Sequence, residues 1–577
     1  WIYNMLNCRF IHSQFSDHSS IRKINSGCPQ GGVISPILWN LVVNELLELL
    51  ISTGIWAQGY ADDIVVCTVG RDTQTASELM QNALSKIENW CYRVGLTVNP
   101  NKAELLLFTN KRKYSLPLIR LFKTCIPIRS NVKYLGVHID NKLNWRFHVE
   151  SKINKCSGLL LQCKRIVGNK WGVHPKYLIW IYNAIIKPIF LHGVIVWWKF
   201  SQSENNQKYI SRLNRLASLT LSNCFSTTST AALERLLDIT PLHIVMQSTA
   251  MSTCHRLILN NLWESKHVQG HNEIFQSLTS VIPQALMPSD SIPRCLSFGM
   301  TNVKFVIPDR EQWLEQRVDT NYDVNIFTDG SRNELGVGAG VFISSKNDFP
   351  FKKDVEDFQC LGNTVTVFQA EFTAICNALI IVDHLEGLNV AFYVDSQSVI
   401  LTLKSNTHTS KIALSCRNHL ASFSRRNNVT VLWVPGHSGI YGNEQADLLA
   451  NTGSAHEFYG PEPALPVSTS VIKKGIKEWV NDSKELYWRN INYASHTKSF
   501  IKELNVNFDA PLICFERSMI RNCLAVITGH GPFKIHLQKL KLAEETDCPK
   551  CGQDSDTALH YITSCHYYKE ARKRTFG

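Results

Sequence analysis

The sequence predicts a multidomain α/β protein, and three observations carry this prediction. The 577 residues suffice for about three to four domains of roughly 150 residues each. Hydrophobic residues make up 44% and charged residues 19%, which is typical of packed domains and not of a disordered chain. Strand-like apolar segments occur between segments with helical spacing, which predicts sheets covered by helices.

Charge and cysteine usage narrow the class of protein. The net charge of +12 favours a polyanionic partner. Most of the 18 cysteines stand singly in apolar contexts, as at Cys67 and Cys376, so we expect a reduced, intracellular compartment, the nucleus or the cytoplasm. The chain starts with Trp1 and without a secretory signal, and we expect its native N-terminus to lie upstream.

Two apolar stretches are long enough to raise the question of a membrane. Residues 37–51 are too few to span one, and Glu45 and Glu48 recur along them. Residues 177–198 are interrupted by Lys187. We therefore expect buried helices, and no membrane, in both places.

A glycine-rich loop, GCPQGGVISP at 27–36, carries the first chemical signal, and an apolar helix follows it to about Leu50. The segment GYADDIVVC at 59–67 then predicts a strand, an acidic turn and a second strand. Adjacent carboxylates at Asp62 and Asp63 are costly between apolar residues unless a cation compensates them. A divalent metal that positions a triphosphate explains the pair better than an exposed acidic turn does.

These residues resemble the palm of reverse transcriptases from non-LTR (LINE-type) retrotransposons, of the I, jockey and R-element kind. The resemblance implies that Asp62 and Asp63 are catalytic Mg²⁺ ligands in a YADD hairpin. It also implies that Gln30, Gly31 and Lys102 contact the template, the incoming nucleotide or its phosphates, with an RNA template and a DNA primer as partners. KYLGVHI at 133–139, followed by Trp145 and His148, is similar to the primer-grip region.

One palm carboxylate has no counterpart in this sequence. The family supplies its first metal-binding aspartate from a strand well before the glycine-rich loop, and only 26 residues precede that loop. Asp17 stands in the polar segment SQFSDHSS and does not resemble that strand. We therefore expect the polymerase to be inert in this chain, although the intact parent protein can be active; a complete polymerase is the alternative if that aspartate lies upstream.

The middle of the chain shows helical spacing and no catalytic pattern. Apolar residues such as Leu178, Tyr182 and Ile185 recur at helical intervals and predict packed helices over 144–282, which resemble a thumb and connection. Basic residues on these helices either line a duplex or form a solvated face; they are Lys164, Arg165, Arg212 and Arg215. Four prolines in 283–320 predict a linker.

A second set of elements begins with NIFTDGS at 325–331, a strand that delivers Asp329 into a glycine turn. GVGAGVFI at 336–343 returns as a strand, and FQAEFTAICNAL at 368–379 is a good helix former that carries Glu371. VAFYVD at 390–395 is a strand ending in an acid, Asp395, before a further helix.

The segment WVPGHSGIYGNEQADLLA at 433–450 supplies a fourth acid. We expect a strand end, a loop that carries His437, and a helix with Asn443 as its N-cap. Asp447 would then lie one turn into the helix and point back toward the loop.

Each of the four acids has an ordinary explanation when it is taken alone: a turn residue, a first-turn charge, an N-cap or a surface position. Together they stand at the ends of adjacent elements and can converge. Four converging carboxylates cannot all stay ionised without cations, and two Mg²⁺ (or Mn²⁺) ions about 4 Å apart would satisfy them.

The motifs TDGS, AEF, DSQS and WVPGHSGIYGNEQADLLA, in this order, resemble ribonuclease H. The resemblance implies that Asp329 bridges both metals, that Glu371 and Asp395 complete one side, and that Asp447 completes the other. His437 would assist proton transfer or product departure. Residues implied to touch the minor groove or the 2′-hydroxyls of an RNA–DNA hybrid are Gln369, Gln397 and Asn443.

The tail carries the spacing C-x2-C-x8-H-x4-C, formed by Cys548, Cys551, His560 and Cys565. This spacing fits a tetrahedral Zn²⁺ site, with His566 as a competing ligand; the alternative is four groups that bind nothing. The pattern resembles the CCHC knuckle that ends many elements of this family.

Together, these resemblances predict a retrotransposon polyprotein fragment, in which a metal-dependent ribonuclease H is attached to an incomplete reverse transcriptase. The alternative is an inactive, basic nucleic-acid-binding relic of a decayed element. The predicted domains are an α+β palm over 1–143, a helical thumb over 144–282, a linker over 283–320, a ribonuclease H-like mixed sheet with flanking helices over 321–456, and a helical region over 457–577 with a small zinc knuckle at 548–565.

Overall fold

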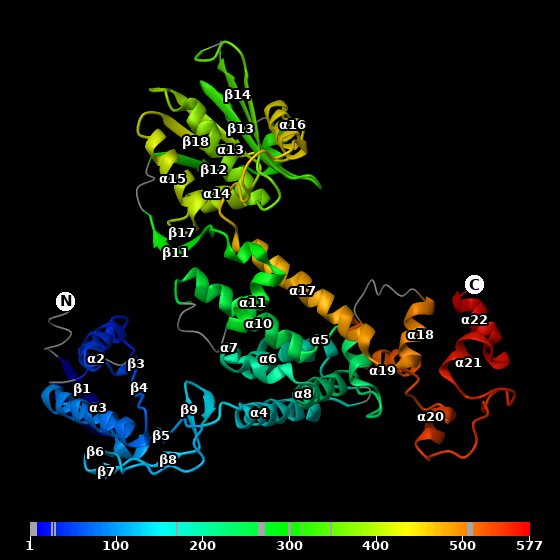
Figure 1. The fold of residues 1–577 in the computed structure, drawn as a ribbon. Coiled ribbons are helices and arrows are strands. Elements are labelled where there is room, and N and C mark those ends of the chain that lie inside the picture. The colour runs from blue at the N-terminus through cyan, green and yellow to red at the C-terminus, as the bar shows by residue number, and fades with distance from the viewer. Residues whose placement is uncertain are drawn as a thin grey trace. The chain divides into compact units, whose positions relative to one another are not determined.

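The computed structural model describes residues 9–24, 27, 31–168, 171–263, 272–297, 302–315, 317–346, 349–504 and 512–576. The chain divides into two compact units, Trp1–Glu150 and Ser151–Gly577. Figure 1 labels the helices and strands of both.

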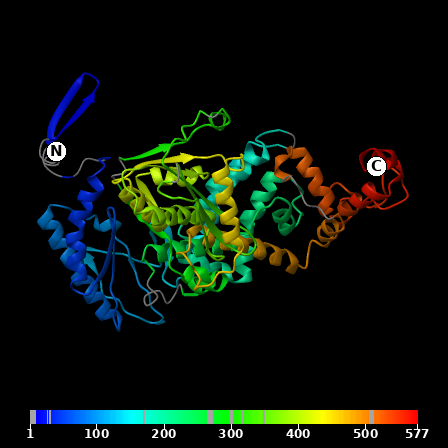
Figure 2. The ribbon, with the colours of Figure 1, turned by 90° about the horizontal axis from the view of Figure 1, so that it is seen from above.

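The first unit contains a ribbon of two antiparallel strands, β1 (Arg9–Phe15) and β2 (His18–Ile24), which run side by side in Figure 2. Asp17 lies in the turn between them. Helices α2 (Ser35–Ile51) and α3 (Thr73–Val94) contribute apolar side chains to one core. The remaining elements are β3 (Trp56–Tyr60), β4 (Asp63–Cys67), η1 (Pro100–Lys102), β5 (Leu105–Leu106), β6 (Arg120–Leu121), β7 (Thr124–Cys125), β8 (Ile128–Arg129), β9 (Asn131–Tyr134) and β10 (Val137–Asp140).

Helix α3 shows how the local sequence sets the limits of an element. The Asp72 side chain accepts a hydrogen bond from the Thr75 backbone N–H and caps the first turn. Gly95 ends the helix with a φ of 68°, a left-handed conformation that glycine adopts without strain. Ala83, Leu84 and Ile87 face the core between these two ends.

The second unit contains a helical region built from two separate stretches of the chain. Its buried side chains include Trp197, Trp198 and Phe190, so the apolar stretch at 177–198 supplies core residues. The helices are α4 (Arg146–Arg165, which begins before the unit boundary), α5 (Pro175–Ile181), η2 (Tyr182–Ile186), α6 (Lys187–Leu191), α7 (Val194–Trp197), η3 (Trp198–Gln202), α8 (Glu204–Ser222), α9 (Thr230–Leu236), α10 (Leu242–Leu259), α11 (Asn272–Val281), η4 (Pro283–Leu286), α17 (Thr469–Asn490), α18 (Ser495–Leu504), η6 (Leu512–Cys514), α19 (Arg517–Thr528), α20 (Lys534–Lys539), α21 (Ala558–Thr563), η7 (His566–Tyr568) and α22 (Lys569–Phe576).

The described helices were also compared with the length and apolar character that a membrane span requires. Within the described ranges, no single helix meets both requirements. One pair meets them only jointly, Pro175–Leu191 with Val194–Gln202, and it is bent by 56°.

A six-stranded mixed sheet forms the rest of the second unit, in the order β12-β18-β16-β13-β14-β15. β13 pairs parallel with β16 and antiparallel with β14, so the sheet is mixed, as the sequence predicted. The strands are β12 (Val303–Val306), β13 (Val324–Arg332), β14 (Val337–Ser345), β15 (Val355–Cys360), β16 (Asn389–Val394) and β18 (Asn428–Trp433).

Helices cover both faces of this sheet. Alternate strand residues face opposite sides, so Ile326 joins the core under α13 (Val367–Val382) and α15 (Lys411–Phe423), whereas Phe327 joins the core under α16 (Tyr441–Ala455). Figure 1 shows α16 on the far side of β13 and β14 from α13. α14 (Gln397–Lys404) follows β16.

Glycines in β14 explain the close approach of α16. A Cβ atom at Gly338 would lie 2.2 Å from the Ala450 carbonyl oxygen, and one at Gly340 would lie 2.3 Å from the Ala446 carbonyl oxygen. The alternating glycines of GVGAG therefore let the helix rest directly on the strand, which fixes the height of Asp447 above the sheet.

The prediction of a linker over 283–320 is wrong, because two strands lie within this segment. Val303–Val306 forms β12, which pairs parallel with β18 at the edge of the sheet, and α12 (Arg310–Leu314) follows. Further upstream, β11 (Ser291–Leu296) pairs with β17 (Thr407–Ser410). The short segment VKFV satisfies its backbone groups along the open edge of β18, a tertiary contact that proline content does not reveal.

Candidate active site and metal centre

Two parallel strands bring the first pair of acids together. Thr328 on β13 pairs with Val394 on β16, so Asp329 within β13 and Asp395 just past the end of β16 lie side by side. The glycine turn predicted after Asp329 is wrong, because β13 continues to Arg332 and Gly330 pairs with Ala339 on β14. A Cβ atom at Gly330 would lie 2.8 Å from the Glu371 backbone nitrogen, so this glycine lets the first turn of α13 approach the strand.

The structure gathers all four predicted acids in one pocket of about 390 Å³. Ligand oxygens of Asp329, Glu371 and Asp395 lie within 4.8 Å of one another, and Asp447 lines the same pocket from α16. Asp329 and Glu371 are 7% and 4% exposed. Few buried carboxylates in proteins lie this close together without a compensating cation.

Burial and mutual repulsion both act on these acids. Burial, followed by the charges of Asp395 and Asp447, raises the pKa of Asp329 to about 7. Burial, followed by the charges of Asp329 and Asp395, raises the pKa of Glu371 well above its ordinary value, and burial also raises that of Asp395. A divalent cation would reverse this preference for the protonated forms.

The donor set fits a hard divalent cation. Glu371 Oε2 is buried and has no hydrogen-bond partner in the described part of the chain. Carboxylate oxygens are the ligands that Mg²⁺ and Mn²⁺ prefer. Asp329, Glu371, Asp395 and Asp447 would hold the metals.

His437 lies on the loop before α16, with its Nδ1 atom 3.8 Å from Asp447 Oδ2. Its side chain is 88% exposed, and its φ of 50° turns the loop at this point. The imidazole can therefore exchange protons between solvent and the pocket.

The predicted N-cap at Asn443 is wrong, because α16 begins at Tyr441 and Ile440 is the residue at its N-cap. A Cβ atom at Gly442 would lie 2.3 Å from the Phe327 ring, so the glycine lets the first turn pack closely on the sheet. Asn443 is buried and lines the pocket, with no described hydrogen-bond partner for its Oδ1 atom.

The two glutamines predicted to touch nucleic acid differ. Gln369 is 1% exposed, closes a capping box with Thr366, and donates from Nε2 to the Pro466 carbonyl oxygen at 2.8 Å. It is therefore not available to a substrate, because its amide is already used to cap α13 and to hold the segment after the sheet. Gln397 is exposed at the start of α14.

Sequence reasoning missed two residues that support the acids. Asn451 donates from Nδ2 to Asp447 Oδ1 at 3.0 Å, and its spacing of four residues on one helix could have revealed it. Trp433 donates from Nε1 to the Asp395 carbonyl oxygen at 2.8 Å, a contact between strands that sequence spacing does not show.

The palm acids stand in a different setting. The predicted hairpin is present, with Tyr60 on β3 paired to Asp63 on β4 and Trp39 donating to the Ala61 carbonyl oxygen at 2.7 Å. Asp62 and Asp63 are both exposed. No third carboxylate joins them in a metal-binding group among the described residues.

The other palm predictions have mixed outcomes. Gln30 lies outside the described residues, whereas Gly31 is described and has a φ of 80°. Lys102 is exposed at the end of η1. β9 and β10 form the predicted primer-grip hairpin, and His148 Nδ1 accepts from the His138 backbone N–H at 3.1 Å.

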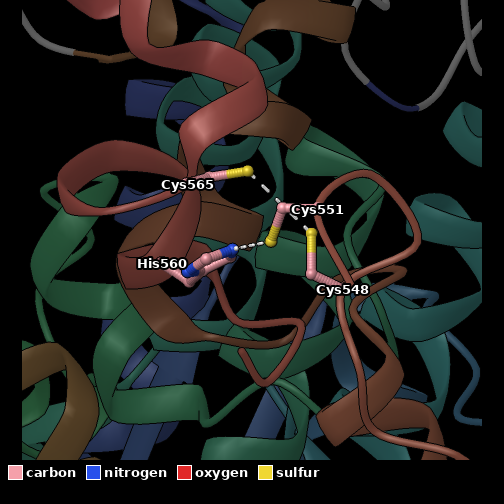
Figure 3. A group of neighbouring side chains, drawn as sticks. All are labelled: Cys548, Cys551, His560 and Cys565. Carbon is pink, nitrogen blue, oxygen red and sulfur yellow. Dashed lines mark hydrogen bonds between the residues drawn. The ribbon is translucent and has the colours of Figure 1, made fainter. Parts of the chain in front are cut away.

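The tail gathers its four predicted ligands, which point toward one another in Figure 3. Cys551 Sγ lies 3.2 Å from His560 Nε2, and Cys548 Sγ lies 4.0 Å from Cys565 Sγ. His566 is exposed and is not part of this group.

Surrounding atoms prepare the cluster for a metal. Burial raises the pKa of the Cys548 thiol, but hydrogen bonds from the Cys551 and Lys550 backbone N–H groups outweigh it and lower that pKa to about 6. His560 Nδ1 lies 3.0 Å from Ser564 Oγ and 3.4 Å from Asp554 Oδ2, which orients Nε2 toward the thiols. Three cysteine sulfurs and an imidazole fit a soft or borderline divalent metal.

Two segments of this chain match families of known proteins. Residues 1–139 match the family "Reverse transcriptase (RNA-dependent DNA polymerase)", and residues 321–455 match the family "RNase H". The chain is 28% identical over 216 residues to a retrovirus-related Pol polyprotein from type-1 retrotransposable element R1 of Bradysia coprophila, which covers 37% of this chain and 22% of that protein.

Two further matches extend the comparison. The chain is 28% identical over 192 residues to an RNA-directed DNA polymerase from mobile element jockey of Drosophila funebris, covering 31% of this chain and 20% of the relative. The crystal structure of RNase H1 from the halophilic archaeon Halobacterium salinarum NRC-1 aligns with 22% of this chain and 96% of its own, at 23% identity and a TM-score of 0.19. The alignments span about a fifth of the length of each of these two relatives.

The sheet order, the four-acid pocket and the family match define residues 321–455 as a ribonuclease H domain. With the reverse transcriptase match at 1–139, the chain carries segments of both families, and the relatives that it matches are proteins of the R1 and jockey mobile elements. The predicted fold class and family are confirmed.

Proposed function

We propose that the ribonuclease H domain hydrolyses the RNA strand of RNA–DNA hybrids with two divalent cations, Mg²⁺ or Mn²⁺. One observation carries the proposal: three carboxylates lie within 4.8 Å of one another in a buried pocket that a fourth acid also lines. Cations in this pocket would activate the attacking water and neutralise charge on the leaving oxygen.

Each residue has a distinct role in this proposal. Asp329, with a ligand oxygen within 4.8 Å of those of Glu371 and Asp395, would contact both metals, and Glu371 would offer its unpartnered Oε2 atom as a ligand. Asn451 holds Asp447 in one orientation through Oδ1, which leaves Oδ2 for a metal. Exposed His437 carries protons between the pocket and solvent as the product leaves.

Recognition of the hybrid falls to polar side chains at the pocket rim. Gln397 is exposed at the start of α14, and Asn443 lines the pocket with an unpartnered Oδ1 atom. Amide groups at these positions can bond to minor-groove edges and 2′-hydroxyls, which distinguish an RNA strand from DNA.

The test uses an end-labelled RNA–DNA hybrid with matched RNA and DNA duplexes. Purified protein should cleave only the RNA strand of the hybrid, only with Mg²⁺ or Mn²⁺, and Asp329→Asn should lose this cleavage. A wild-type protein that binds the hybrid and leaves the RNA intact would support the inactive nucleic-acid-binding relic instead.

We infer a narrower role for the palm segment in this chain. Asp62 and Asp63 lack a third described carboxylate nearby, so the segment would contact an RNA template and a DNA primer without extending the primer. Robust primer extension by the purified chain would contradict this inference.

We also propose that the tail cluster binds Zn²⁺ and stabilises the C-terminal region in a reduced, intracellular setting, the nucleus or the cytoplasm. Metal analysis should give one zinc per chain, lost in the double variant Cys548→Ser with Cys551→Ser and retained in Cys125→Ser, an exposed cysteine elsewhere. Zinc that survives the double substitution would refute the site.

A further inference from the structure

A second groove, of about 590 Å³, begins where the carboxylate pocket ends. Ser331 and Val367 line the pocket, and their chain neighbours Arg332 and Thr366 line the groove. Because adjacent Cα atoms are about 3.8 Å apart, the two depressions lie close to each other. The opposite wall belongs to α17, which lies outside the ribonuclease H family match.

Hydrogen bonds fix the segment just before α17, which begins at Thr469. Val467 donates to the Pro288 carbonyl oxygen at 2.7 Å and accepts from the Asp290 N–H at 3.0 Å. Gln369 donates to the Pro466 carbonyl oxygen at 2.8 Å from the first turn of α13, the helix that carries Glu371. The beginning of α17 therefore has a defined position beside the active site.

Polar and charged groups from both walls face the groove. They are Arg332, Asn363 and Thr366 from the sheet domain, and Ser470, Lys474 and Glu478 from α17.

The two cations of the groove remain available to a ligand. Arg332 makes a single long hydrogen bond, 3.4 Å from Nη2 to the Asn363 carbonyl oxygen, and no ion pair with any described residue. Lys474 pairs with Glu478 at 3.7 Å, but their side chains are 71% and 62% exposed, and exposed pairs of this kind are easily replaced.

We infer that this groove binds the sugar–phosphate backbone of the nucleic acid as it leaves the active site, so that α17 extends the substrate track. The inference rests on the proposed ribonuclease H function. A strand that places one phosphate at the carboxylates carries further phosphates about 3.4 Å apart along the duplex axis, and these must pass the groove. Arginine, lysine, amide and hydroxyl groups are the side chains that contact phosphates.

The test compares two neighbouring lysines on α17. Lys474 lines the groove, whereas Lys477 is exposed outside it. On a long hybrid, Lys474→Glu should raise KM about tenfold with kcat unchanged and reduce the salt dependence of binding by about one charge, whereas Lys477→Glu should match the wild type. Lys474→Gln, which removes the charge without reversing it, should give a smaller rise in KM.

The contacted strand can be identified in the same assay. Neutral methylphosphonates are placed one at a time in the DNA or the RNA strand; the position that weakens binding of the wild type but not of Lys474→Gln marks the phosphate in the groove. A KM that rises equally in both Glu variants, or no such position in either strand, overturns the inference.

Failure of the groove can be separated from failure of catalysis. A wild type that cleaves the hybrid while Lys474→Glu and Lys477→Glu behave alike refutes the groove and keeps the ribonuclease H proposal. If the wild type cleaves nothing, the ribonuclease H proposal fails. Hybrid binding is then measured in EDTA, and the groove proposal holds only if Lys474→Glu binds the hybrid more weakly than Lys477→Glu does.

Discussion

Two acidic regions of this chain look alike in sequence and differ in structure. Asp62 and Asp63 form the tip of an exposed hairpin, whereas Asp329 and Glu371 lie buried in a pocket with two further acids. Solvent can screen the first pair, so nothing in its surroundings requires a cation. Asp329 and Glu371 are shielded from solvent, and burial and repulsion raise the pKa values of these two acids.

We therefore expect convergence and burial, more than a motif alone, to decide which of these acids bind a metal. The YADD motif is as specific a signal as any of the ribonuclease H motifs, yet the described structure gives it two carboxylates and the pocket four.

Removing one pocket acid should have the largest effect. Asp395→Asn deletes a ligand and should lower hybrid cleavage by about 10³-fold, roughly 4 kcal/mol of transition-state stabilisation. Asp62→Asn, the matched change on the hairpin, should leave the cleavage rate within about twofold of the wild-type rate. Single-turnover rates on one hybrid measure both variants. Equal losses in both variants would erase the contrast between the regions.

Glu234 tests whether burial alone accounts for the pocket. Asn214 Nδ2 donates to Glu234 Oε1 at 2.6 Å and Tyr487 OH donates to Oε2 at 3.3 Å, so this acid has neutral partners instead of acidic neighbours. Burial raises its pKa to about 7, and we expect no cation dependence.

The sign of its pH effect follows from this shift. A carboxyl whose pKa is raised on folding stabilises the protein fully below its unfolded pKa of about 4.5, and this stability is lost as the pH rises through about 7. Glu234→Gln should therefore raise the free energy of unfolding at pH 8 by up to about 3 kcal/mol and leave it unchanged at pH 4. The thermal midpoint should rise at pH 8 only. Thermal scans check this, and a gain of the same size at both pH values would mean that the charge is not the cause.

Mg²⁺ should stabilise the pocket and not the hairpin. At ten times its dissociation constant a single bound ion adds about 1.4 kcal/mol, so amides of β13 and β16 should exchange about tenfold more slowly, while those of β3 and β4 should not change. Asp329→Asn should lose this protection. Protection confined to β3 and β4 in hydrogen-exchange mass spectrometry would reverse the assignment.

Local patterns predicted much of the fold and the site. The strands that carry Asp329 and Asp395, the helix that carries Glu371 and the YADD hairpin follow from periodicity and turn residues over short distances. The spacing of Cys548, Cys551, His560 and Cys565 likewise identified residues that the structure brings together.

The errors all depend on contacts between distant segments. β12 exists because an open strand edge is available to it, and the start of α16 depends on the packing of Gly442 against Phe327. The motif around Gln369 predicts a contact with substrate, but the side-chain amide of Gln369 donates to the Pro466 carbonyl oxygen, 97 residues away. Patterns over short stretches of sequence do not reveal contacts between residues that are far apart in the chain.

Mn²⁺ binding in the presence of an uncleavable hybrid tests the central claim most directly. Electron paramagnetic resonance should detect two Mn²⁺ ions about 4 Å apart, as a coupled pair, in the wild type and in Asp62→Asn with Asp63→Asn. Asp329→Asn should lose the coupled signal. A pair that survives Asp329→Asn, or that disappears when only the hairpin acids are changed, would contradict the assignment of the metals to the four-acid pocket.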